Sequence, residues 1–257
     1  MNRESRIMNF QNIADMPSML RRAAGRAFRS IAGSPRLPVF DRLARADPRW
    51  ATFVDVMEYI NYEAVPGDIV EFGVFTGISL ALLAKSYSFD SKGMSRRVAG
   101  FDSFEGLPCA GEPHARWKPG DCSSSHGWHP LLSDGDPVTP QVTLDLFSAC
   151  GLPPPILHVG PFEQTLPRAI PAEHPQIALA HVDCDLYEST HVALEAIAPA
   201  IQDGTVLLFD DWFHYKGHPG KGEARAFGEF LAAHAEWGAV QYRSYATFCN
   251  AFILHRR

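Results

Sequence analysis

One stretch decides the fold, and it reads Asp68-Ile69-Val70-Glu71-Phe72-Gly73-Val74-Phe75-Thr76-Gly77-Ile78-Ser79. The apolar run over residues 68–72 predicts a buried strand, and the two glycines after it predict a tight turn. An apolar segment from about 78 to 87 predicts a helix directly behind that turn. Ligands of open α/β sheets bind at the carboxyl ends of strands, so this turn is a candidate ligand site.

Working outward, the chain repeats the alternation of strand and helix. Further strands are expected at 97–102, 156–159, 177–182, 205–209, 239–243 and 250–255, and helices at about 48–62, 140–150, 187–201 and 222–236. This order predicts a mostly parallel sheet covered on both faces. The last two strands have no helix between them, which predicts an antiparallel strand at the end. Residues 103–138 are rich in Gly, Pro, Ser and His and predict a long binding loop.

Composition excludes several classes of protein. The 257 residues are 46% hydrophobic and 20% charged, which is ordinary for a folded domain and unlike disordered, collagen or coiled-coil chains. A net charge of -6 argues against a nucleic-acid partner. No window approaches the roughly 20 apolar residues of a membrane span. The five cysteines form no CxxC pair, which favours a reducing cytoplasm over disulfides or a zinc cluster.

The charge is uneven along the chain. Residues 1–45 hold nine arginines against three acidic residues. We expect a helix that docks on a partner subunit or an anionic surface, with a transit peptide as the alternative. Residues 1–64 are expected to form a helical N-terminal extension, and residues 65–257 a single catalytic or binding domain.

The turn and the next strand suggest a nucleoside ligand. Gly73 and Gly77 let the backbone approach a ligand, and Glu71 could accept hydrogen bonds from an ammonium group. Asp102 ends the following strand, where a carboxylate can accept both hydroxyls of a ribose. The spacing matches neither a dinucleotide fingerprint nor a P-loop. The structural alternative is a tight turn beside a loop carboxylate.

Acidic residues end two later strands. Asp183 and Asp185 follow one strand, and Asp210 and Asp211 follow the next. Neighbouring strand ends lie roughly 5 Å apart, so these carboxylates would repel unless they were paired, protonated or neutralised. No run of Lys or Arg lies nearby in the sequence. Oxygen ligands suit Mg²⁺, Mn²⁺ or Ca²⁺, although a purely structural cluster is the alternative. A bound cation would lower the pKa of a substrate hydroxyl, and a remaining carboxylate could take its proton.

Other polar and aromatic residues have simpler expectations. His126 and His129 are expected to face solvent, and His181 to lie in the core or support the site. Cys184 should be a small buried residue that points away from its acidic neighbours. The aromatic residues after the second acidic pair, Trp212, Phe213 and Tyr215, could line a substrate or pack in the core.

Four motifs resemble the macrocin O-methyltransferase family. They are Val70-Glu71-Phe72-Gly73-Val74, Asp102-Ser103-Phe104-Glu105-Gly106-Leu107-Pro108, Asp183-Cys184-Asp185-Leu186-Tyr187-Glu188-Ser189-Thr190 and Asp210-Asp211-Trp212. The resemblance covers roughly residues 65–235. It implies a single Rossmann-like class I methyltransferase domain with a seven-stranded, mostly parallel sheet and an antiparallel last strand. It also implies an enzyme that uses S-adenosylmethionine and Mg²⁺, or Mn²⁺, to methylate a hydroxyl of a sugar or glycosylated natural product.

The resemblance further implies a role for each matched residue. Asp183, Asp210 and Asp211 would bind the metal, and Asp185 would be the general base. The methyl donor would be lined by two segments, Glu71, Phe72, Gly73, Val74 and Phe75, and Asp102, Ser103, Phe104, Glu105 and Gly106. Family members tend to pair through their N-terminal helices, so a homodimer is expected.

Three other functions stay open at this stage. A catechol or phenol O-methyltransferase is also compatible with the metal, because the two oxygens of a catechol could both coordinate the cation. A non-catalytic protein could keep the donor site and dock a partner through the basic N-terminus. A metal-dependent hydrolase could use the same acidic residues, although no basic phosphate clamp lies beside them.

Overall fold

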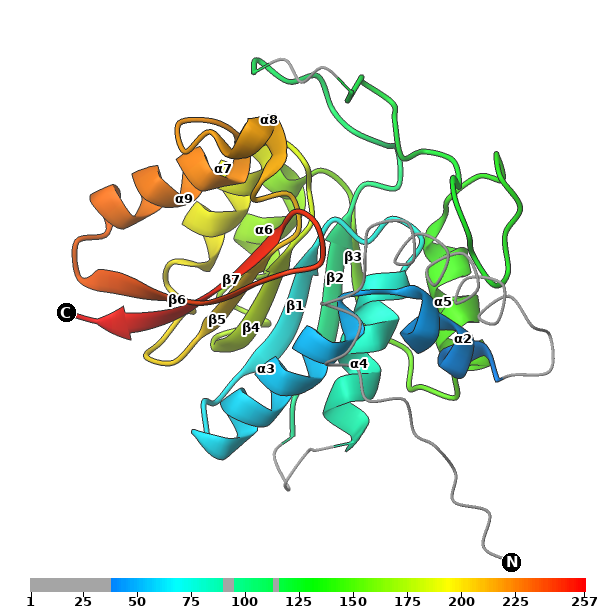
Figure 1. Ribbon diagram of the computed structural model, residues 1–257, viewed down its shortest axis with the longest axis horizontal. Coiled ribbons are helices and arrows are strands. Elements are labelled where there is room, and N and C mark those ends of the chain that lie inside the picture. Colours follow the sequence, from blue (N-terminus) through cyan, green and yellow to red (C-terminus); the bar gives the residue numbers. More distant parts are fainter. Residues whose placement is uncertain (1–37, 90–94, 113–115) are drawn as a thin grey trace, which may run out of the picture.

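The computed structural model describes residues 38–89, 95–112 and 116–257 (Figure 1). The expectations for the arginine-rich segment therefore fall largely outside the described residues. Residues 38–64 of the expected extension carry helices α2 (Val39–Ala46) and α3 (Trp50–Tyr62). Both helices contact α4 (Ile78–Phe89). The extension therefore packs directly on the sheet-bearing part of the chain.

A seven-stranded sheet forms the centre of the molecule, with strand order β3-β2-β1-β4-β5-β7-β6. β1–β5 pair in parallel, and β7 pairs antiparallel with both β5 and β6. The expected mostly parallel sheet with an antiparallel last strand is confirmed. The strand bounds are β1 Asp68–Phe72, β2 Val98–Asp102, β3 Ile156–Val159, β4 Ile177–Val182, β5 Val206–Phe209, β6 Trp237–Tyr245 and β7 Cys249–Arg256.

Helices cover both faces of this sheet (Figure 1). α2, α3, α4 and α5 contribute to one hydrophobic cluster, and α6, α7 and α9 to the other. The bounds not yet given are α5 Pro140–Ala149, α6 Phe162–Ala169, α7 Tyr187–Ile197, α8 His214–Gly217 and α9 Gly222–Ala233. The three layers leave the carboxyl ends of β1, β2, β4 and β5 at one rim.

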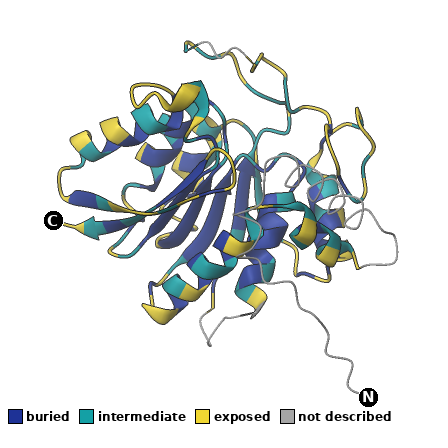
Figure 2. Ribbon diagram, in the orientation of Figure 1, coloured by how far each residue is buried: buried dark blue, intermediate teal, exposed yellow. Residues whose placement is uncertain are grey.

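The central strands are buried along their whole length, as Figure 2 shows. Successive side chains of β5 enter opposite layers: Val206 and Leu208 join the cluster under α3 and α4, while Leu207 and Phe209 join the cluster under α7 and α9. Period-two burial on two apolar faces explains why these strands are nearly continuous hydrophobic runs.

The structure differs from the sequence expectation at several helices. α6 was not expected, because it is only eight residues long and contains Pro167, which obscures the helical period. α2 was not expected as a separate helix either. α7 ends at Ile197 rather than at 201, since Pro199 cannot continue the helical hydrogen bonding. The four-residue α8 was not expected either, and its Tyr215 and Lys216 have positive φ values. The remaining strands and helices follow the expected order.

The long loop is present and lies at the rim formed by the carboxyl ends of the strands. The described part of residues 103–138 contains no helix or named strand, and its one isolated bridge joins Ser124 to Pro137. Glu188 of α7 accepts hydrogen bonds from the backbone N–H groups of Gly111 and Glu112 at 2.8 and 2.9 Å. In the described ranges, no helix is both long and apolar enough to cross a membrane.

Candidate functional site

The glycine turn after β1 is wedged between two neighbouring strand ends. The Gly73 N–H donates to the carbonyl of Phe101, and the Asp183 N–H donates to the carbonyl of Phe72, both at 2.9 Å. Gly73 has φ +86°, and a Cβ placed on it would lie 1.8 Å from the carbonyl oxygen of Asp183. Only glycine fits this position, so the turn needs Gly73 for both its φ and its lack of a side chain.

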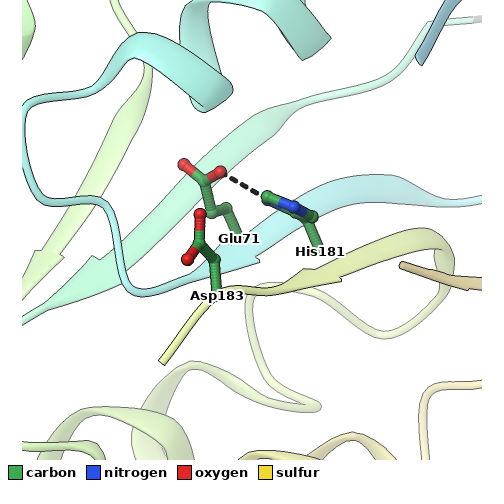
Figure 3. Close-up of side chains that lie close together, drawn as sticks. All are labelled: Glu71, His181 and Asp183. Atoms are coloured by element: carbon green, nitrogen blue, oxygen red, sulfur yellow. Dashed lines mark hydrogen bonds and ion pairs between the residues drawn. The ribbon is translucent and has the colours of Figure 1, made fainter. Parts of the chain in front are cut away.

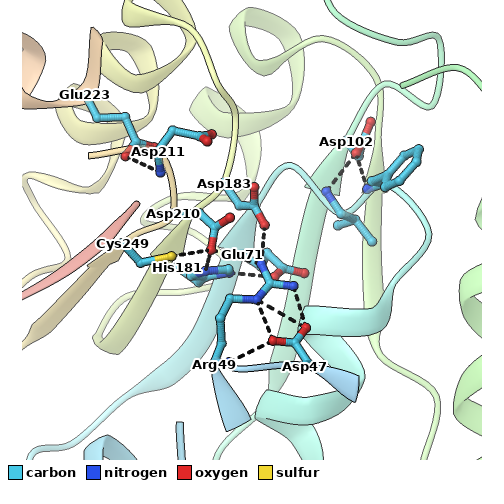
Figure 4. Close-up of polar contacts among 12 residues, drawn as sticks. Asp47, Arg49, Glu71, Asp102, His181, Asp183, Asp210, Asp211, Glu223 and Cys249 are labelled. Atoms are coloured by element: carbon cyan, nitrogen blue, oxygen red, sulfur yellow. Dashed lines mark hydrogen bonds and ion pairs between the residues drawn. The ribbon is translucent and has the colours of Figure 1, made fainter. Parts of the chain in front are cut away.

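Asp102, at the end of β2, holds the glycine turn in place (Figure 4). Its Oδ2 accepts hydrogen bonds from the N–H groups of Val74 and Phe75 at 2.7 and 2.8 Å, and its Oδ1 accepts one from Phe104 at 2.7 Å. The carboxylate therefore couples the end of β2 to the turn after β1. Asp102 therefore has the structural role that was the alternative to ligand binding. Its Oδ1 accepts only one of these hydrogen bonds and can accept another from a ligand.

A cavity of about 580 Å³ connects the glycine turn to the acidic strand ends. One end is lined by the turn, by the start of the long loop and by residues 160–163 between β3 and α6. The other end is lined by Asp183, Asp185, Asp210 and Asp211. Such a volume is in the usual range for a cofactor and small-molecule site.

The expected donor residues divide into two groups in this structure. Seven of them line the cavity: Gly73, Val74, Phe75, Asp102, Ser103, Glu105 and Gly106. Glu71 and Phe72 are fully buried beneath it, and Phe104 packs against the hydrophobic cluster on the α3–α4 face. Residues 160–163 also line the cavity, although the sequence between β3 and α6 carries no distinctive motif that would predict it.

An arginine lies between two of the acidic residues. Nη1 of Arg49 is 3.0 Å from Oδ2 of Asp183 and 3.0 Å from Oδ1 of Asp210 (Figure 4). Asp47 holds the other edge of the guanidinium, with Oδ2 2.8 Å from Nη2 and Oδ1 3.0 Å from Nε. No run of Lys or Arg lies near these carboxylates in the sequence, but the fold brings this single arginine to two of them.

Arg49 escaped notice because it is distant in sequence. It lies 134 residues before Asp183 and 161 before Asp210, just ahead of α3. Burial alone would raise the pKa of Asp210, but attraction to Arg49 and to His181, whose Nε2 lies 3.6 Å from its Oδ1, holds that pKa well below its usual range. Burial and the nearby charge of Asp210 instead raise the pKa of Asp183. Asp210 is therefore the more firmly ionised of the two.

A buried ion pair lies beneath the acidic rim (Figure 3). Nδ1 of His181 is 2.7 Å from Oε1 of Glu71, and both side chains are fully buried. Burial would lower the pKa of His181, but the nearby Asp210 carboxylate and the hydrogen bond to Glu71 outweigh it and raise that pKa to about 10. The imidazole is thus protonated at neutral pH, and its positive charge stabilises the ionised form of Asp210. Among the described residues, Glu71, His181 and Asp183 are the only three whose candidate ligand atoms lie within 4.8 Å of one another.

A second acidic group surrounds Asp211. Oε2 of Glu223 on α9 accepts a hydrogen bond from the Asp211 N–H at 2.9 Å, and Oδ1 of Asp211 is 3.0 Å from Nδ1 of His214. Burial, together with repulsion from Asp185 and Glu223, raises the pKa of Asp211. Burial raises the pKa of Asp185 to about 6. Glu223 was not predicted as a site residue; it lies 12 residues after Asp211, in the first turn of α9.

The remaining expectations have mixed outcomes. His126 is exposed as expected, and its ring lies 4.9 Å from that of Phe75. His129 is not solvent-facing: it is buried, and its Nδ1 accepts hydrogen bonds from two backbone N–H groups at 3.1 Å. Cys184 is buried as expected. Trp212 packs in the core, with its ring centroid 4.7 Å from that of Phe252.

Comparison with known proteins assigns this chain to a family. The family model described as macrocin-O-methyltransferase (TylF) matches residues 23–234. A curated relative, the 8-demethyl-8-(2,3-dimethoxy-alpha-L-rhamnosyl)-tetracenomycin-C 4'-O-methyltransferase of Streptomyces olivaceus, is 30% identical over 195 residues. That match covers 68% of this chain and 70% of the relative.

Solved structures share the fold. The O-methyltransferase NovP has a TM-score of 0.63 and 23% identity, with 82% of this chain and 80% of NovP covered. The calicheamicin methyltransferase CalS11 has a TM-score of 0.63 and 21% identity, with 98% of this chain and 99% of CalS11 covered. The chain therefore belongs to the macrocin O-methyltransferase family and is an O-methyltransferase with S-adenosylmethionine as its methyl donor.

Proposed function

We propose that this enzyme methylates a hydroxyl of a sugar carried by a natural product, with a divalent metal at the acidic rim and Asp185 as general base. The observation that carries the proposal is the single cavity of about 580 Å³ shared by the glycine turn and the acidic strand ends. Donor and acceptor sites in one cavity allow direct transfer, because proximity replaces a bimolecular encounter.

The donor end is proposed to bind S-adenosylmethionine, which supplies an electrophilic methyl group. Gly73 brings the backbone of the turn against the cavity, and Asp102 keeps that turn in shape through three N–H groups. Oδ1 of Asp102 accepts only one of these, so it can also accept from a ribose hydroxyl. Residues 160–163 also line the cavity, and the Gly160 N–H donates to the carbonyl of Asp102.

The metal is proposed to be Mg²⁺ or Mn²⁺, held by Asp183, Asp210 and Asp211. All three offer carboxylate oxygens, which these cations prefer. Oδ2 of Asp211 is buried without a hydrogen-bond partner, which is the state of an oxygen that lacks its cation. A bound cation would lower the pKa of a coordinated hydroxyl. Repulsion from Asp185 and Glu223 also raises the pKa of Asp211, and a divalent cation bound there would offset that repulsion.

Asp185 is proposed to take the proton of the acceptor hydroxyl. It lines the same cavity as the donor segment and the other carboxylates, and its backbone is in the left-handed region at φ +61°. Such strain in a residue other than glycine is concentrated at functional sites. Its pKa, raised by burial to about 6, is close to that of an effective base at neutral pH.

The sugar acceptor is proposed from the curated relative, whose name describes methylation of a rhamnosyl group. The cavity wall includes Trp117 and Trp128 of the long loop, which provide the apolar surface that glycosylated ring systems need. A homodimer also remains a prediction, which light scattering of the full chain would test.

The proposed function is tested by methyl transfer from S-adenosylmethionine to a panel of rhamnosylated polyketides, with Mg²⁺ or with EDTA. We expect product only with Mg²⁺, while calorimetry shows S-adenosylhomocysteine binding in both buffers. Asp185→Asn should reduce kcat by about 10²- to 10⁴-fold without weakening donor binding. The matched control is Asp134→Asn, an exposed loop residue, which should leave kcat unchanged. Undiminished transfer in EDTA would exclude the metal, and an active Asp185→Asn enzyme would exclude the base.

A further inference from the structure

Two of the proposed metal ligands already share a cation supplied by the chain itself. Asp183 and Asp210 each direct one oxygen at the same atom, Nη1 of Arg49, at 3.0 Å (Figure 4). Oδ1 of Asp210 also accepts from Sγ of Cys249 at 3.2 Å and lies 3.6 Å from Nε2 of His181. Oδ2 of Asp183 and Oδ1 of Asp210 therefore already accept hydrogen bonds from side chains of the protein.

Arg49 is anchored in this position from behind. Asp47 contacts Nε and Nη2 of the guanidinium and also accepts a hydrogen bond from the Arg49 backbone N–H at 2.9 Å. The guanidinium carbon lies 5.9 Å from the ring centroid of Phe53, and the side chain is 16% exposed. A planar fork gripped along one edge presents its remaining nitrogen in a fixed direction.

This arrangement and a metal complex exclude each other at the shared oxygens. A guanidinium has only donors and a permanent positive charge, so it repels a divalent cation bound to the same carboxylates. Among the described residues, Asp183, Asp210 and Asp211 do not bring three ligand atoms within 4.8 Å of one another. The carboxylates must turn to gather around one ion, and that turn breaks the contacts with Nη1.

We propose that Arg49 is an internal cation that competes with the divalent metal for Asp183 and Asp210. The inference rests on the metal site of the proposed function. When the metal binds, Nη1 releases both carboxylates while Asp47 keeps its hold on the opposite edge of the guanidinium. The strength of the arginine contacts then sets the metal concentration at which the site fills.

The test is calorimetric titration of Mg²⁺ into the EDTA-treated and dialysed full chain. Arg49→Gln removes the competing charge and should bind Mg²⁺ about tenfold or more tightly than the wild type. Arg49→Lys keeps the charge but cannot bridge both carboxylates and Asp47, so its Mg²⁺ affinity should fall between the two. Arg243→Gln is the matched control, because Arg243 of β6 pairs at 2.6 Å with Asp55 of α3, the helix that begins directly after Arg49, and it should leave Mg²⁺ affinity unchanged.

Thermal unfolding provides a second readout. In EDTA, Arg49→Gln should unfold below the wild type, because two carboxylates lose their counter-ion, and Mg²⁺ should raise its midpoint more than that of the wild type. If the wild type binds Mg²⁺ and Arg49→Gln binds it equally or more weakly, competition is overturned and the proposed metal site stands. If neither binds Mg²⁺ while both bind S-adenosylhomocysteine, the proposed metal site is itself wrong, and the competition with it.

Discussion

Replacing Gly73 with alanine tests whether the glycine turn and the acidic rim are one rigid unit. The new Cβ would lie 1.8 Å from the carbonyl oxygen of Asp183 and 2.7 Å from its carbonyl carbon, whereas Cβ contacts under 3.0 Å are essentially never found. Both atoms are backbone, in the strand end that carries the proposed metal ligands. The strand ends must therefore separate by more than 1 Å, rather than a side chain moving aside.

The structure separates the two costs of this substitution. Alanine at φ +86° carries a left-handed penalty of about 1–2 kcal/mol. Forced overpacking against backbone adds about 3 kcal/mol, at the upper end of such changes. Gly135 is the control, because it has φ +88° and no atom within 4 Å of an added Cβ. Gly135→Ala therefore isolates the backbone penalty.

The measurement is thermal unfolding followed by circular dichroism, with donor-product binding by calorimetry. At about 2–4 °C per kcal/mol for a chain of this size, Gly135→Ala should lower the Tm by about 2–8 °C and Gly73→Ala by about 8–20 °C. Gly73→Ala should also lose S-adenosylhomocysteine binding, whereas Gly135→Ala should keep it. If the two variants unfold within about 2 °C of each other and bind equally well, the close contact between the turn and β4 does not exist.

Three further predictions concern other contacts. Asp102→Ala removes the acceptor of three backbone N–H groups, so S-adenosylhomocysteine binding measured by calorimetry should weaken about tenfold or more; unchanged binding would separate Asp102 from the donor site. Burial favours a higher pKa for Asp68, but hydrogen bonds from His174 and Arg97 outweigh it and lower the pKa below its ordinary 3.8. The ionised form therefore stabilises the fold above that pH and loses this contribution as the pH falls through the lowered pKa. Asp68→Asn should reduce the free energy of unfolding at pH 7 by about 1–3 kcal/mol, with a gap to the wild type that narrows below pH 4 in urea titrations; a gap independent of pH would contradict this linkage. Glu188→Ala frees residues 111 and 112 of the long loop, so steady-state kinetics should show a KM for the acceptor raised about three- to tenfold with donor affinity unchanged, and an unaltered KM would exclude the loop from acceptor binding.

The central strands and the glycine turn could be predicted because their signals are local. Residues 68–72 and 177–182 are unbroken apolar runs, and burial on both faces of a covered sheet requires that pattern. The acidic residues at 183–185 and 210–211 were placed together for a similar reason, since the ends of neighbouring parallel strands meet at one rim. The helix α6 was hidden by its short length and by Pro167.

The sheet, the turn and the acidic rim follow from the sequence, because each depends on the order of residues over a few positions. Which charges meet at that rim follows from the packing of distant segments. Arg49 joins Asp183 and Asp210 across 134 and 161 residues, and His181 pairs with Glu71 across 110. No local pattern encodes such pairings, since they depend on how α3 and the strands pack and on the cost of burying a charge without a partner.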